Sequence, residues 1–228
     1  MERTNKIKLT GYLGFPKVFG EEAVAQLSLP INKGTQEEQD WKYLNIKIAA
    51  DKSKLEFKDY DRKRVEISGY ITGESFTPKG GLKEISVIKI VVGSIKEIEK
   101  GVKGVNEVTL TSMSRFIREF GEKGVGAQLS VSFKSPESET DYKYANISLS
   151  GNRNTLKLVD GEIITVKGFI KADFFVPKGE EKEISLPVIV GLEILEREVP
   201  GSTNTDDGPP PPVEESPDVE IEDDEIPF

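Results

Sequence analysis

The fold is decided by one alternating stretch that the chain contains twice. It reads Asp40-Trp41-Lys42-Tyr43-Leu44-Asn45-Ile46-Lys47-Ile48 in the first half, and it returns as Asp141-Tyr142-Lys143-Tyr144-Ala145-Asn146-Ile147 in the second. A period of two is typical of a β-strand with one buried face. We therefore expect Leu44, Ile46 and Ile48 to face a core. Trp41 and Tyr43 then lie on the opposite, outward face.

These two strands belong to a repeat that runs through both halves of the chain. The matching blocks are Leu9-Thr10 with Leu110-Thr111, Phe19-Gly20-Glu21 with Phe120-Gly121-Glu122, Ala25-Gln26-Leu27-Ser28 with Ala127-Gln128-Leu129-Ser130, Phe76-Thr77-Pro78-Lys79-Gly80 with Phe175-Val176-Pro177-Lys178-Gly179, and Glu84-Ile85-Ser86 with Glu183-Ile184-Ser185. Their order and nearly constant offset indicate a domain duplication, since the period is far too long for a solenoid. We expect one domain over residues 1–100 and a second over residues 101–199.

Each unit contains five strand-like segments. In the first unit they lie at residues 6–9, 24–29, 44–48, 65–71 and 85–92. Residues 51–60 predict a short helix with Asp51 as its cap, and residues 152–158 take its place in the second unit. Five strands with the helix between the third and fourth is the order of an OB-fold, a small Greek-key barrel that binds oligonucleotides on one face. We predict an all-β chain of two tandem five-stranded OB-fold barrels, with one short helix per domain.

Composition removes several classes of function. The chain has no cysteine and no histidine, which excludes disulfides, thiolate metal sites, the usual zinc ligands and Ser-His-Asp triads. No apolar run is long enough to span a membrane, and the first residues lack the apolar core of a signal peptide. We therefore expect a cytoplasmic protein that is not an enzyme, with no cofactor, no metal and no membrane segment.

The net charge of −9 is concentrated at one end of the chain. Residues 1–100 carry 18 basic and 15 acidic residues, and residues 101–200 carry 13 and 15, whereas residues 201–228 carry ten acidic residues and no basic one. Residues 200–228 also hold four consecutive prolines and few apolar side chains, so we expect a disordered acidic tail. Its last residues, Ile226-Pro227-Phe228, are apolar beside acids, which suits capture in an apolar pocket with a basic rim.

Several stretches resemble bacterial single-stranded-DNA-binding proteins, the SSB family. They are Asn5 to Gly14 followed by Ala23 to Leu29, Trp41-Lys42 before the third strand, Glu66-Ile67-Ser68-Gly69-Tyr70-Ile71 with Phe76 beyond it, and the tip Asp223-Asp224-Glu225-Ile226-Pro227-Phe228. Two OB-folds in one chain resemble the duplicated members of that family, which form homodimers with four OB-folds. The resemblance implies sequence-nonspecific binding and protection of single-stranded DNA in replication, recombination and repair. It also implies that residues 223–228 recruit partner proteins of those processes.

The resemblance also suggests which residues contact DNA. The family's base-stacking positions fall at Trp41 and Phe76, and through the internal repeat at Tyr142 and Phe175. Tyr43 and Tyr144 are further candidates because they share the outward face of their strands with Trp41 and Tyr142. The family usually has more aromatic residues, whereas Lys47 and Ser148 stand at one such position here, so stacking should be sparser.

Phosphates require basic partners, and the strongest candidates are lysines that both units retain. These are Lys42 with Lys143 and Lys79 with Lys178. An exposed lysine on a strand is often only a solvated surface group, so the repeat is what favours these four. Two alternatives remain open: an OB-fold protein that binds RNA, and an adaptor whose barrels bind proteins. A carboxylate-dependent nuclease is disfavoured, because no acidic cluster with ligand-like spacing is duplicated.

Overall fold

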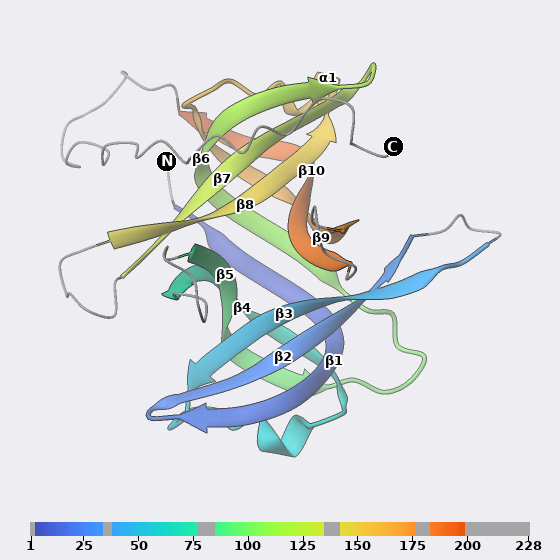
Figure 1. Cartoon of the computed structure of the whole chain (residues 1–228), viewed down its shortest axis with the longest axis vertical. Coiled ribbons are helices and arrows are strands. Elements are labelled where there is room, and N and C mark those ends of the chain that lie inside the picture. Colours follow the sequence, from blue (N-terminus) through green and yellow to red (C-terminus); the bar gives the residue numbers. More distant parts are fainter. Residues whose placement is uncertain (1–2, 34–37, 77–84, 135–141, 177–182, 199–228) are drawn as a thin grey trace.

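The computed structural model describes residues 3–33, 38–76, 85–134, 142–176 and 183–198, which form two β-barrels side by side (Figure 1). The first barrel contains β1 (Asn5–Phe19), β2 (Glu22–Asn32), β3 (Trp41–Asp51), β4 (Arg64–Phe76) and β5 (Ile85–Glu97). Neighbours in the order β3-β2-β1-β4-β5 pair antiparallel. A short parallel pairing of β3 with β5 closes the ring. This is the predicted five-stranded barrel.

The second barrel repeats the first strand for strand. It contains β6 (Asn106–Phe120), β7 (Gly124–Lys134), β8 (Tyr142–Asn152), β9 (Ile163–Phe175) and β10 (Ile184–Glu198). Its antiparallel pairs follow the same order, and β8 with β10 supplies the parallel closure. The prediction of two tandem five-stranded barrels is therefore confirmed. The expected tail, residues 200–228 with the tip Asp223 to Phe228, lies outside the described residues.

The helix predicted over residues 51–60 is wrong in extent. Strand β3 continues to Asp51, whose carboxylate accepts hydrogen bonds from the Ser53 amide at 2.9 Å and the Ser53 hydroxyl at 2.6 Å. After this single turn only the 3-10 helix η1 (Lys58–Tyr60) forms. A turn suffices because the segment needs only to place Phe57, which is fully buried, in the end of the barrel. A short isolated helix would also be marginal by itself.

The second unit has a true helical turn at the predicted place. Helix α1 (Arg153–Leu156) begins after Asn152, whose side chain accepts a hydrogen bond from the Asn154 amide at 2.9 Å. An asparagine at this position satisfies an otherwise unpaired amide of the first turn. The turn buries Leu156 in the barrel end. No helix in the described part of the chain is long and apolar enough to cross a membrane.

The barrels are joined by their first strands. Strand β1 pairs antiparallel with β6, with Ile7 opposite Val108, so that the ten strands form one hydrogen-bonded sheet. Both of these side chains are buried. Asn5 caps the joint by exchanging two side-chain hydrogen bonds with the backbone of Ile71, at 2.7 and 2.9 Å. In the second barrel, the Asn106 side chain exchanges two equivalent hydrogen bonds with the backbone of Ile170, at 2.8 and 2.9 Å.

A glycine allows a second close approach between the barrels. A Cβ atom added to Gly73 of β4 would lie 2.4 Å from the Phe133 ring of β7 and 2.7 Å from the Ala145 Cβ of β8. Both neighbours are buried side chains of the second barrel. The hydrogen atom at this position therefore lets β4 rest directly on the β7–β8 hairpin.

Replacing Gly73 by alanine should destabilise the protein. The new methyl group must displace a buried ring, and overpacking of this kind typically costs about 1–3 kcal/mol. Gly14→Ala is the matched control, because nothing lies within 4 Å of the added Cβ there. Thermal unfolding should show a lower midpoint for Gly73→Ala only. Equal midpoints for the two variants would show that the barrels do not meet at Gly73.

Acid should weaken an ion pair within the first barrel. Glu66 is almost buried, and its carboxylate lies 2.9 Å from Lys96 Nζ and 3.3 Å from Lys8 Nζ. The hydrogen bond from Lys96, helped by Lys8, lowers the pKa of Glu66 below its ordinary value of 4.5. A lowered folded-state pKa stabilises the fold above the ordinary value, and this contribution is lost as pH falls through the folded-state pKa.

Glu66→Gln should therefore be less stable than the unmodified protein at neutral pH, and the difference should shrink as the pH falls below about 4.5. Denaturant unfolding at a series of pH values measures this. The exposed Glu196, replaced by glutamine, serves as the control. A stability deficit of Glu66→Gln that stays constant down to low pH would refute the ion pair.

Candidate nucleic-acid interface

The outward face of β3 carries two exposed aromatic rings. Trp41 is 54% exposed and Tyr43 is 52% exposed. Leu44, Ile46 and Ile48 are buried on the opposite face, which confirms the orientation predicted from their alternation. The Trp41 indole N–H donates a hydrogen bond to the Gln39 side chain at 3.1 Å, so its edge is held while its faces remain accessible.

A third ring extends this surface and was missed from the sequence. Tyr12 of β1 is 44% exposed, and its ring meets that of Tyr43 edge to face, with centroids 6.5 Å apart and planes at 75°. Strand register brings it there, because Tyr12 pairs with Ser28 of β2 and Ser28 pairs with Asn45 of β3. We call Tyr12, Tyr43 and Trp41 the aromatic band. The available signal was the alternation of β1, which places Tyr12 opposite the buried Leu9 and Leu13.

The second barrel carries a shorter version of the same surface. Tyr142 is 58% exposed and Tyr144 is 41% exposed, both on β8. The repeat places Met113 where the first barrel has Tyr12, and the Arg115 Nε atom lies 3.1 Å from the Met113 sulfur. This barrel therefore offers two exposed rings on β8, and a guanidinium contacts the methionine that replaces the third ring. The first barrel offers three rings.

Four of the predicted contact groups fall where the structure gives no side chain. Phe76 and Phe175 are the last residues of β4 and β9, and their side chains are outside the described part of the chain. Lys79 and Lys178 belong to the adjoining segments 77–84 and 177–182, which are also outside it. Their roles stay predictions.

Lys42 and Lys143 do not lie on the same face as the rings. Lys42 alternates with Trp41 and Tyr43, and its ammonium lies 2.5 Å from the Glu183 carboxylate of the second barrel. This hydrogen bond raises the pKa of Lys42 above its usual value. Lys143 likewise reaches across to the first barrel and donates a hydrogen bond to the Ser75 hydroxyl at 3.3 Å. The structure thus separates these lysines from their neighbouring rings and turns them toward the junction of the barrels.

A charged group does share the face of the aromatic band. Lys47 projects from β3 on the same side as Trp41 and Tyr43 and pairs with Glu74 of β4 at 2.6 Å. Glu74 also lies 3.8 Å from Lys89, which itself pairs with Glu22 at 2.7 Å. Lys47 is the exposed lysine of this network, with 43% of its side chain accessible, and ion pairs of exposed lysines are individually weak. A phosphate that approaches this face can therefore compete for the Lys47 ammonium group.

The ends of the β1–β2 and β6–β7 hairpins add exposed rings away from the band. Phe15 and Phe19 stand on the first hairpin, and Phe116 and Phe120 on the second. Phe15 and Phe116 have positive φ angles of 55° and 54° at the bulge of each strand, which turns their side chains outward.

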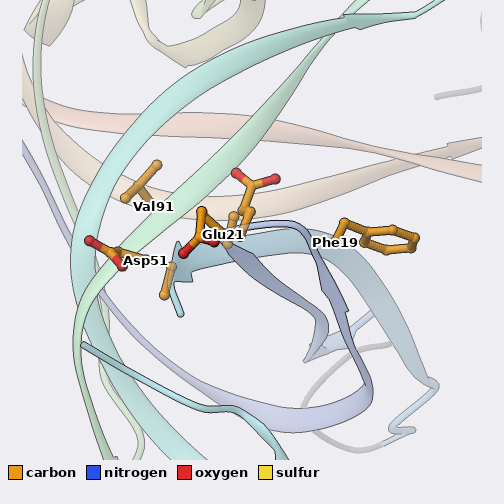
Figure 2. Close-up of a pocket in the computed structure, with 7 residues that line it drawn as sticks. Phe19, Glu21, Asp51 and Val91 are labelled. Carbon is orange, nitrogen blue, oxygen red and sulfur yellow. The ribbon is translucent and has the colours of Figure 1, made fainter. Parts of the chain in front are cut away.

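An open pocket beside the first hairpin is acidic. It is lined by Glu21, Glu22 and Asp51 together with Phe19, Ala49, Ala50 and Val91. Figure 2 shows the Phe19 ring pointing away from the carboxylates of Glu21 and Asp51. Phosphates would be repelled here, so this end of the barrel is a poor entry for nucleic acid. Within the described ranges, no group of three acidic side chains is placed to hold a metal ion.

The chemistry available to this site is therefore binding by stacking. Aromatic faces accept any nucleobase, and each stacked base contributes on the order of 1–3 kcal/mol. The exposed strand faces, rather than a closed cavity, provide the surface. Such a surface follows an extended polymer better than it encloses a small molecule.

Comparison with known proteins supports the fold. No family model and no curated protein matches the sequence. Among solved structures, a deletion mutant of the single-stranded DNA binding protein from Thermus aquaticus superposes with a TM-score of 0.56 at 15% identity, covering 92% of this chain and 99% of that one. The wild-type protein of the same organism gives 0.55 at 14% identity, covering 90% and 98%. The chain thus shares the fold of these proteins over almost their full length.

Proposed function

We propose that this protein binds and protects single-stranded DNA without sequence preference in the cytoplasm, during replication, recombination and repair. The observation that carries the proposal is the aromatic band on β1 and β3, repeated in shorter form on β8. The chain also shares its fold with the single-stranded DNA binding protein from Thermus aquaticus. Stacked rings beside exchangeable lysines are the usual means of holding single strands without reading their sequence.

The proposal includes two kinds of protein partner. By the sequence resemblance, two copies associate as a homodimer with four barrels. The tip Asp223 to Phe228 recruits proteins of replication, recombination and repair, supported by its apolar end beside a run of acids. An acidic segment is also repelled by DNA, which suits a role in contacts with proteins.

Substitution within the band should weaken binding to oligo(dT). Trp41→Ala removes a stacking platform, so we expect a loss of about 1–3 kcal/mol in binding free energy. Tyr12→Leu should lose about 1 kcal/mol. Fluorescence anisotropy of labelled oligo(dT) measures both, with poly(rU) as competitor. Tyr70→Leu is the matched control, because Tyr70 is a tyrosine of similar exposure on β4, outside the band.

Three results would contradict the proposal. An unmodified protein that does not bind oligo(dT) at low salt would favour an adaptor that binds proteins. Tighter binding to poly(rU) than to poly(dT) would favour an RNA-binding protein. Equal losses for Tyr12→Leu and Tyr70→Leu would remove the aromatic band as the binding surface.

Deleting residues 223–228 should separate the two proposed activities. We expect the shortened protein to bind oligo(dT) as well as the full chain, because the aromatic band is intact. The shortened protein should no longer capture purified recombination and repair proteins from the same organism. Phe228→Ala in the full chain is the finer variant, since it keeps every acidic residue. Retained capture by both variants would refute the tip as the recruiting segment.

A further inference from the structure

One carboxylate of the second barrel holds two lysines of the first. Glu183 lies 2.5 Å from Lys42 Nζ through one oxygen and 3.4 Å from Lys33 Nζ through the other. The three side chains are 34–36% exposed, so the cluster is accessible to solvent. It carries two positive charges against one negative charge. Asp40 adds only a weaker, longer-range attraction to Lys42.

The two ammonium groups also lie over the same aromatic ring. Lys33 Nζ lies 4.6 Å and Lys42 Nζ 5.4 Å from the ring centroid of Phe174, on β9 of the second barrel. Both distances are within the range of a cation–π contact. The ring helps to fix the two lysines beside each other. This pair of ammonium groups is therefore organised before any ligand arrives.

The position of this cluster follows from the shape of the first barrel. The end of β2 and the start of β3 extend past the barrel toward β9 (Figure 1). Alternation along this arm places Trp41 on its outward face and Lys42 on the face toward the second barrel. A base stacked on Trp41 would thus lie one residue away from the lysine cluster.

We propose that Lys33, Lys42 and Phe174 form a phosphate-binding site for the single strand at the junction of the barrels, and that the Glu183 carboxylate occupies this site in the DNA-free protein. The inference rests on the proposed function. It adds two residues, Lys33 and Phe174, and an internal competitor to the DNA surface. The ligand is the phosphodiester of the strand that also stacks on Trp41.

The chemistry of the two anions supports the exchange. A carboxylate and a phosphodiester each carry one negative charge and present two oxygens to paired cationic donors. Exposed lysine–carboxylate pairs are weak, so a polyanion held nearby by stacking can replace Glu183. The hydrogen bond from Lys42 also lowers the pKa of Glu183, which keeps both partners charged at neutral pH.

The second arm shows the same geometry with a different partner. Lys143, the repeat equivalent of Lys42, reaches Ser75 of β4, which is the equivalent of Phe174. The serine side chain is neither aromatic nor charged. The described residues thus show a lysine–carboxylate cluster beside an aromatic ring at the first arm. Glu84, the equivalent of Glu183, lies outside the described residues.

Glu183→Gln tests the competition directly, since glutamine keeps the shape and removes the charge. We expect labelled oligo(dT) to bind about three- to tenfold more tightly, because exposed pairs of this kind are individually weak. The gain should shrink at high salt, which screens the pair in the unmodified protein. Glu97→Gln is the matched control. Glu97, the last residue of β5, forms an ion pair with Lys63 at 2.8 Å and lies away from the Lys33–Lys42 cluster.

A double-mutant cycle assigns the gain to Lys42. Lys42→Gln should lower the affinity for oligo(dT) more in the Glu183→Gln background than in the unmodified protein. The reason is that the Lys42 ammonium is no longer paired with Glu183 and is available to the phosphate. Equal gains for Glu183→Gln and Glu97→Gln would reduce the effect to net charge and overturn the site. The site would also be overturned if Glu183→Gln lowered the melting temperature but left the affinity for oligo(dT) unchanged. The ion pair would then serve only to hold the two barrels together. An unmodified protein that fails to bind oligo(dT) would instead overturn the proposed function, and this inference with it.

Discussion

The antiparallel pairing of β1 with β6 determines how every other surface of the molecule is placed. It makes one hydrogen-bonded sheet from two closed barrels and leaves neither first strand as a free edge. Unpaired edges invite association with other strands, so the joint also protects the chain. Because the pairing is centred on Ile7 and Val108, the two barrels are related by an approximate twofold arrangement. Each β-hairpin arm consequently reaches toward the other barrel.

This arrangement divides the chemistry of each arm between its two faces. The outward face of β3 carries the rings, and the inward face carries the lysine that meets the second barrel. Strand alternation alone produces this division, because consecutive side chains point to opposite sides. The proposed function gives base stacking and phosphate contact to neighbouring residues of this strand. The distribution of charge is compatible with this role, since ten of the 40 acidic residues lie in residues 201–228.

Much of the fold was predictable because it rests on local alternation repeated twice. The strand faces of residues 40–48 and the five-strand order follow directly from hydrophobic period and duplication. The helix over residues 51–60 was not predictable, because the burial of Phe57 needs only a turn, and tertiary packing decided the outcome. The aromatic band was found in part: Trp41 and Tyr43 are evident from β3, whereas Tyr12 joins them only through the register of three strands. The partners of Lys42 and Lys143 lie on the other barrel, which no local pattern reveals.

We propose above all that single-stranded DNA lies along the outward faces of β1, β2 and β3 and of their counterparts β6, β7 and β8. Amide chemical-shift mapping by NMR, with oligo(dT) added to the full chain, tests it most directly. The account predicts that the largest changes cluster at Tyr12, Trp41, Tyr43, Tyr142 and Tyr144, with little change at the acidic pocket around Glu21 and Asp51. Changes concentrated at that pocket, with the rings of β3 and β8 unaffected, would contradict it.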